Sequence, residues 1–137
     1  MRLNLEQTEI ELTGDSPCFR ETPYEGQNMV FVVTPLDRNK FSRASDANTK
    51  HGRKGRTKLD ELGFQTSLFV ACVKSWRNID DQHGNPLPCD DENKKMLATK
   101  FMTLAGCVVD GASDEGARMD DAQEALVGNS ATSSTGD

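Results

Sequence analysis

The chain offers few residues that could perform nucleophilic catalysis. Its four cysteines could act as nucleophiles, and His51 and His83 are its only histidines. Such chemistry needs a base that an orienting group holds close to the nucleophile, but each histidine lies in a polar segment flanked by glycine. No nucleophile-elbow pattern and no glycine-rich phosphate motif is present in the sequence. We therefore expect a protein that is not an enzyme.

Carboxylates gather in one segment, at Asp80, Asp81, Asp90, Asp91 and Glu92. The spacing of these residues is not that of an EF-hand, which needs ligands at alternating positions and a terminal Glu. The sequence also lacks the CxxC and HxxxH spacings of zinc sites. We expect Asp80 and Asp81 to form a turn and Asp90 or Asp91 to cap a helix. No metal ion or cofactor is predicted.

Basic residues gather in a second segment, at Lys50, Arg53, Lys54, Arg56 and Lys58. A cluster of this kind can contact phosphates through charge alone, so a small nucleic-acid-binding protein is one alternative. The net charge of −6 and the absence of interleaved aromatic residues count against nucleic acid as the partner. Pairing of this segment with the acidic C-terminal part could instead bring two subunits together.

Length and composition favour one soluble intracellular domain. The chain has 137 residues, of which 35% are hydrophobic, and this length suits a single domain. The longest nearly continuous apolar run, residues 68–73, is far shorter than the roughly 20 residues of a membrane-spanning helix. No apolar run follows Arg2, so we expect no secretory signal and no membrane association. We predict a single α+β domain over residues 1–110 and a weakly helical to disordered acidic tail over residues 111–137.

The N-terminal part is predicted to form a small β-sheet or hairpin. Residues 3–6 and 10–12 alternate apolar and polar side chains, which is typical of half-buried strands. Residues 13–17 have the composition of a turn. Residues 29–33 are β-branched, aromatic and uninterrupted, which suits a strand covered on both faces.

Two or three packed helices should follow this sheet. Thr34 is the expected N-cap of a short helix that ends near residue 44, and residues 45–56 are expected to form a mobile polar loop. The capping-box spacing of Thr57 and Asp60 opens a central helix that runs to about residue 78. A connector over residues 79–89 leads to a last helix that reaches Leu104 or Val109 and places Leu97, Phe101 and Leu104 on one packed face.

The central helix carries a wide apolar stripe that includes Phe64, Leu68, Phe69 and Trp76. Each of these side chains taken singly is most simply a core residue. However, only one other strong apolar helix face and one strong strand are available to cover the stripe. Part of it could therefore remain exposed to a client segment or to another copy of the chain, so these four are the candidate partner-binding residues.

A pattern that begins at the predicted end of the central helix carries a resemblance to a known family. Residues 76–88 read W-x-x-I-x-D-x-x-G-N-x-L-P, and an acidic helix cap with Asn93 follows. This segment resembles the hallmark region of the tail assembly chaperones of tailed bacteriophages. The resemblance covers about residues 29–104 and implies a helix–turn–helix junction. Trp76, Ile79, Gly84, Pro88 and Asn93 would shape that junction.

The resemblance implies a non-enzymatic protein made late in infection. Such chaperones bind the tape measure protein and keep it soluble while the tail tube assembles around it, so the tube protein is a further expected partner. They act in the host cytoplasm, often exist also as a longer frameshifted form, and are absent from the finished virion. The apolar stripe would also permit a homo-oligomer. A structural subunit of the tail remains an alternative, because such a subunit could share the long N-terminal β region and the short acidic C-terminal part.

Overall fold

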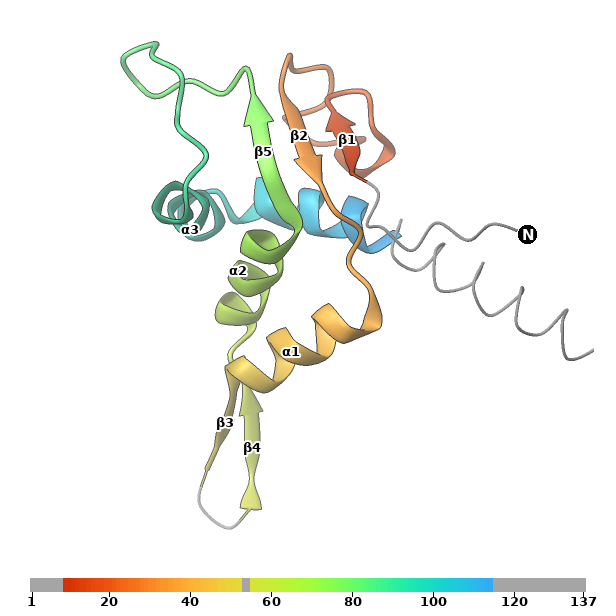
Figure 1. Ribbon diagram of the computed structural model, residues 1–137, viewed down its shortest axis with the longest axis vertical. Coiled ribbons are helices and arrows are strands. Elements are labelled where there is room, and N and C mark those ends of the chain that lie inside the picture. Colours follow the sequence, from red (N-terminus) through yellow and green to blue (C-terminus); the bar gives the residue numbers. More distant parts are fainter. Residues whose placement is uncertain (1–8, 53–54, 115–137) are drawn as a thin grey trace, which may run out of the picture.

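The computed structural model describes residues 9–52 and 55–114, and it has the predicted α+β architecture (Figure 1). A three-stranded antiparallel sheet has the order β1-β2-β5, with β1 at Ile10–Thr13, β2 at Val30–Val33 and β5 at Val73–Arg77. A separate hairpin, the short 3-10 helix η1 (Pro17–Phe19) and four α-helices complete the described part of the chain. The predicted strand over residues 3–6 and most of the predicted tail lie outside the described residues.

The best predicted strand is the central strand of the sheet. In β2, Phe31 lies opposite Leu12 of β1 and opposite Trp76 of β5, and Phe31 and Val33 are fully buried. Its β-branched and aromatic side chains pack well on a sheet covered by other elements. The predicted strands at residues 10–12 and 29–33 are therefore confirmed. The turn at residues 13–17 is confirmed as well, since the Ser16 amide donates to the Thr13 carbonyl at 2.9 Å.

Helix α1 (Arg38–Asn48) begins and ends later than predicted. Its N-cap is Asp37, whose carboxylate accepts a hydrogen bond from the Lys40 amide at 3.0 Å. The prediction of Thr34 as the N-cap is wrong. The Thr34 amide donates to the Cys72 carbonyl at 2.8 Å and so joins the end of β2 to a helix end that is distant in the sequence. The helix also continues four residues beyond Ala44, to Asn48.

The predicted mobile loop is wrong for most of its length, because a β-hairpin follows α1 directly. Strand β3 (Thr49–His51) pairs antiparallel with β4 (Thr57–Leu59), and the hairpin stands away from the rest of the fold at the bottom of Figure 1. The Asp60 amide donates to the Asn48 carbonyl at 2.8 Å and closes its base. The strand side chains are exposed, apart from the half-buried Thr49, so the segment lacks the apolar alternation by which a half-buried strand is predicted.

Helix α2 (Glu61–Cys72) is capped by Asp60 and is much shorter than predicted. The residues from Val73 to Arg77 leave the helix and form β5, so Trp76 is a strand residue. The helix stops where its Cys72 carbonyl meets the Thr34 amide, and the extended chain beyond it gains a ladder of hydrogen bonds along β2. Non-local pairing thus overrides the local helical pattern.

Helix α3 (Asp91–Lys100) begins at the predicted cap Asp90, whose carboxylate accepts from the Asn93 amide at 2.7 Å. The single long helix expected beyond it is wrong. Phe101 leaves the helical conformation, and a further helix starts at residue 102 and continues through residue 114, past the expected boundary at 110. The break turns Phe101 outward, where it is 47% exposed, while Leu104 is buried. The prediction of one packed face formed by Leu97, Phe101 and Leu104 is therefore wrong for Phe101, which is not buried with the other two.

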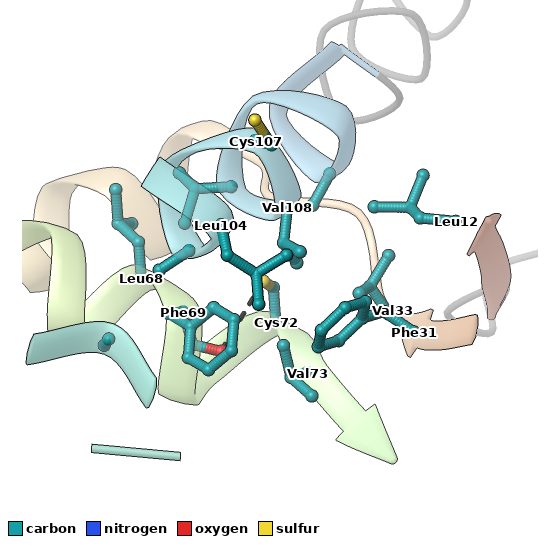
Figure 2. Packing of buried hydrophobic residues seen from close by; sticks show 14 of the residues in the cluster. Leu12, Phe31, Val33, Leu68, Phe69, Cys72, Val73, Leu104, Cys107 and Val108 are labelled. Carbon is teal, nitrogen blue, oxygen red and sulfur yellow. Dashed lines mark hydrogen bonds between the residues drawn. The ribbon is translucent and has the colours of Figure 1, made fainter. Parts of the chain in front are cut away.

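The core joins the sheet to α2 and to the helix of residues 102–114 (Figure 2). The Phe31 ring makes edge contacts with the rings of Phe69, at a centroid distance of 6.3 Å, and Trp76, at 6.1 Å. Val108 of the last helix is fully buried on the same cluster. The Leu36 amide donates to the Ala112 carbonyl at 2.9 Å, which ties that helix to the segment after β2. The central apolar stripe therefore contributes to the monomer core.

Candidate functional site

The segment with the W-x-x-I-x-D-x-x-G-N-x-L-P pattern forms a loop that folds back on β5. The Trp76 indole N–H donates to the Leu87 carbonyl at 2.7 Å. The Leu87 amide in turn donates to the Ile79 carbonyl at 2.9 Å. Asp80 and Pro86 form an isolated antiparallel bridge between these two contacts and the tip. Two residues of the pattern that lie eleven positions apart are thus joined directly.

The tip of this loop is a tight turn built around Asp81. Its carboxylate accepts hydrogen bonds from the amides of His83, at 2.8 Å, and Asn85, at 3.0 Å. The Gly84 amide donates to the Asp81 carbonyl at 3.0 Å, and Gly84 has a φ of +81°. The expected turn role of Asp81 is confirmed. The expected helix–turn–helix junction is wrong in one respect, because a strand precedes the turn.

The turn is connected to α3 through the last residues of the pattern. The Asn93 side-chain amide donates to the Pro88 carbonyl at 2.9 Å, one turn inside the helix that Asp90 caps. Pro88 itself is exposed, and Ile79 is half-buried against the core. The residues expected to shape the junction therefore lie in one hydrogen-bonded unit that runs from β5 to α3.

Replacing Gly84 with alanine should lower the free energy of unfolding by about 1–2 kcal/mol, the cost of a left-handed conformation for a residue with a Cβ. A Cβ at this position meets no atom within 4 Å, so backbone strain is the main cause of the loss. Gly84→Asn is the matched control and should cost less, because Asn tolerates this conformation. Urea unfolding of both variants measures the difference in their free energies of unfolding. Equal losses would contradict backbone strain as the main cause.

An apolar groove lies between this loop, α3 and the segment before β2, with a volume of about 1100 Å³. Met29, Leu97 and Leu104, each less than a tenth exposed, form its floor. The half-buried and exposed apolar side chains that line it are Tyr24, Ile79, Leu87, Met96 and Phe101.

The rim of this groove is polar. Asp80, Asp81 and His83 of the loop lie on the rim together with Lys100 at the end of α3. An apolar centre within a polar rim is the usual anatomy of a protein-binding surface. Met96 adds an unbranched, flexible side chain that can adjust to the shape of a bound group. The arrangement suits apolar side chains of a partner better than a small polar ligand.

The four side chains proposed from the sequence as partner contacts do not line the groove. Leu68, Phe69 and Trp76 are 2%, 0% and 8% exposed, and they belong to the core. Phe64 is half-buried and packs against Phe41 with a ring centroid distance of 6.1 Å. In this conformation the first three cannot reach a partner. Phe101 lines the groove, although the sequence predicts it on a packed helix face with Leu97. The spacing of these two residues is helical, and no local signal in the sequence marks the break between the helices.

The basic segment is in part a strand pair. Lys50, Arg56 and Lys58 are exposed on the hairpin, while Arg53 and Lys54 lie outside the described residues. The apolar groove contains none of these cations. The two features are therefore separate surfaces.

The cysteines are poor nucleophiles in this environment. Burial raises the pKa of the Cys72 thiol to about 12. Burial also raises the pKa of Cys18 to about 11, with Cys107 nearby as a second cause. Both thiols are thus protonated near neutral pH. Within residues 9–52 and 55–114, no group of three His, Cys, Asp or Glu side chains could hold a metal ion.

Comparisons of the chain with protein-family models, with curated proteins and with solved structures gave no match. Among the helices in the described ranges, none combines the length and apolar character needed to cross a bilayer.

Proposed function

We propose that this protein is a tail assembly chaperone of a tailed bacteriophage. We name the apolar groove described above the client groove. It would bind an apolar helical segment of the tape measure protein and keep that protein soluble while the tail tube assembles. The observation that carries the proposal is the position of the loop with the tail-chaperone pattern. Ile79 and Leu87, two residues of the pattern, supply apolar side chains to one wall of the groove.

The chemistry of the groove fits an amphipathic helix as the client. Such helices bind by laying one apolar face into a groove, with anchors three or four residues apart. Each large apolar side chain that becomes buried contributes about 1.5–3 kcal/mol. Part of this gain is lost to the cost of association, so two or three anchors give a modest affinity. Reversible binding suits a chaperone that must release its client.

Phe101 is the best probe of this binding mode, because it lines the client groove and is 47% exposed. Phe101→Asp would place a charge against the apolar face of the client. We expect it to weaken binding by about 2 kcal/mol, or roughly 30-fold, as for a binding hot spot. The measurement is the soluble yield of the tape measure protein when it is co-expressed with wild type and with the variant.

Met102→Asp is the matched control. Met102 is the next residue, it is 53% exposed, and it does not line the groove. The control should support the client as well as wild type does. If wild type leaves the yield of the client unchanged, the proposed function is wrong. If both variants act like wild type, the groove is not the binding site.

The same role predicts where the protein is found. A chaperone acts in the host cytoplasm and leaves before the tail is complete, so mass spectrometry of purified particles should not detect the chain. Stoichiometric amounts in the particles would favour a structural subunit of the tail instead.

A further inference from the structure

The β3–β4 hairpin has one strongly basic face. In its antiparallel register Thr49 lies opposite Leu59, Lys50 opposite Lys58, and His51 opposite Thr57. The Gly52 amide continues this pairing by donating to the Arg56 carbonyl at 2.5 Å. Side chains alternate between the faces of a strand. Lys50, Lys58 and Arg56 therefore share one face, which we name the basic face.

The opposite face of the hairpin has no lysine, arginine or carboxylate. It carries Thr49, His51, Thr57 and Leu59. On the basic face, Lys50 and Lys58 stand directly across from each other. Like charges directly opposite each other destabilise a strand pair. A bound anion would remove this repulsion between Lys50 and Lys58. Without an anion, the placement of the two lysines contributes nothing to the stability of the hairpin.

The three cations are open to a partner. All three are exposed, and the hairpin extends away from the sheet and its covering helices (Figure 1). In the part of the chain that the structure describes, none of them forms an ion pair. The carboxylate of Asp60, the nearest acidic residue after β4, already accepts from the Gly63 amide as the cap of α2.

We infer that the basic face binds the phosphate backbone of a nucleic acid. A two-stranded ribbon is narrow enough to enter the major groove of DNA. Arg56 directly precedes β4 and lies two residues from Lys58, a span of about 7 Å in an extended chain. Phosphates recur along one DNA strand every ~3.4 Å of axis, so both cations can face phosphates of the same backbone. This activity is independent of the client groove and goes beyond the proposed chaperone role.

The charge density favours a nucleic acid over an acidic protein segment. One acidic segment of this chain that could be such a partner is residues 115–137, which carry five carboxylate side chains and one arginine. Only Asp120 and Asp121 are adjacent in it, so an extended segment would offer the three clustered cations few partners. A nucleic acid offers one phosphate at every nucleotide.

The test measures binding of the full chain to a short labelled DNA duplex and to a labelled single-stranded RNA, by fluorescence anisotropy at several salt concentrations. The variant combines Lys50→Ala, Arg56→Ala and Lys58→Ala. Loss of three phosphate contacts should flatten the slope of log affinity against log salt by about three and weaken binding at low salt on the order of 100-fold. The control combines Arg43→Ala, Lys74→Ala and Lys95→Ala, three exposed cations away from the hairpin.

The inference holds if wild type and control bind either probe alike and the hairpin variant does not. It fails if wild type binds neither probe at low salt, or if the control is weakened as much as the hairpin variant. It fails also if a peptide of residues 115–137 binds the basic face while both nucleic acids do not, since the partner is then an acidic protein segment. Phe101→Asp should leave nucleic-acid binding unchanged, which separates this result from the test of the chaperone role.

Discussion

Replacing Phe69 with alanine should lower the free energy of unfolding by about 3–5 kcal/mol, as expected for a fully buried aromatic side chain. Phe69 is 0% exposed and lies in the last turn of α2, where its ring meets the edge of Phe31 on the central strand. Figure 2 shows it between the sheet and the helix that carries Val108. Its removal would leave a cavity where three elements meet.

Urea unfolding followed by the fluorescence of Trp76, the only tryptophan, measures this loss. The control is Leu62→Ala on the same helix, where the side chain is 43% exposed. A surface change of this kind should alter stability by about 0.5 kcal/mol. A loss below about 1 kcal/mol for Phe69→Ala would mean that this residue is not part of a packed core. Such a result would support the alternative hypothesis from the sequence, in which Phe69 contacts a partner.

Gly14→Ala should also be strongly destabilising, by about 3 kcal/mol. Gly14 is buried where the turn after β1 passes the segment that leads into β2. A Cβ there would lie 2.6 Å from the Gln27 amide nitrogen and closer still to the Gln27 carbonyl oxygen. Both atoms belong to the backbone, so no rotation of a side chain can relieve the clash. The two segments would have to separate, and the hydrogen bond from the Gly26 amide to the Gly14 carbonyl would be strained.

Gly106→Ala is the matched control and should have the opposite sign. Gly106 lies within the helix of residues 102–114, and a Cβ there would meet only the Gln65 side chain, at 3.5 Å, an ordinary contact. Alanine in a helix interior is favoured over glycine by about 1 kcal/mol. Thermal unfolding followed by circular dichroism compares the two variants. Equal behaviour of the two glycines would contradict the close approach at Gly14.

The tail-chaperone pattern and the client groove are related through the fold. In the sequence, residues 76–88 are a string of turn-forming and apolar positions. In the structure, the Trp76 indole and the Asn93 amide hold the two ends of the loop, and its apolar residues Ile79 and Leu87 face the groove. The residues that give the pattern its form are thus those that shape one wall of the candidate site.

Several local features of the chain are predictable from the sequence alone. The β-branched run at residues 29–33 is a strand, Asp90 caps a helix, and Asp81 organises a turn, because each depends on neighbours within a few residues. The large apolar residues of the central stripe were recognisable as core candidates for the same reason, since burial follows side-chain type.

Other features depended on partners far away in the chain. The end of α2 at Cys72 requires the Thr34 amide, and the strand at Val73–Arg77 requires the edge of β2. The hairpin at residues 49–59 is local, but its exposed side chains have no apolar alternation from which strands could be predicted. The exposure of Phe101, and with it the client groove, follows from how two consecutive helices pack against different neighbours. Most residues differ in helix preference by only a few tenths of a kcal/mol. Hydrogen bonds and burial between distant segments contribute more than this difference, so the tertiary structure decides where α2 ends, where β5 forms and whether Phe101 is exposed.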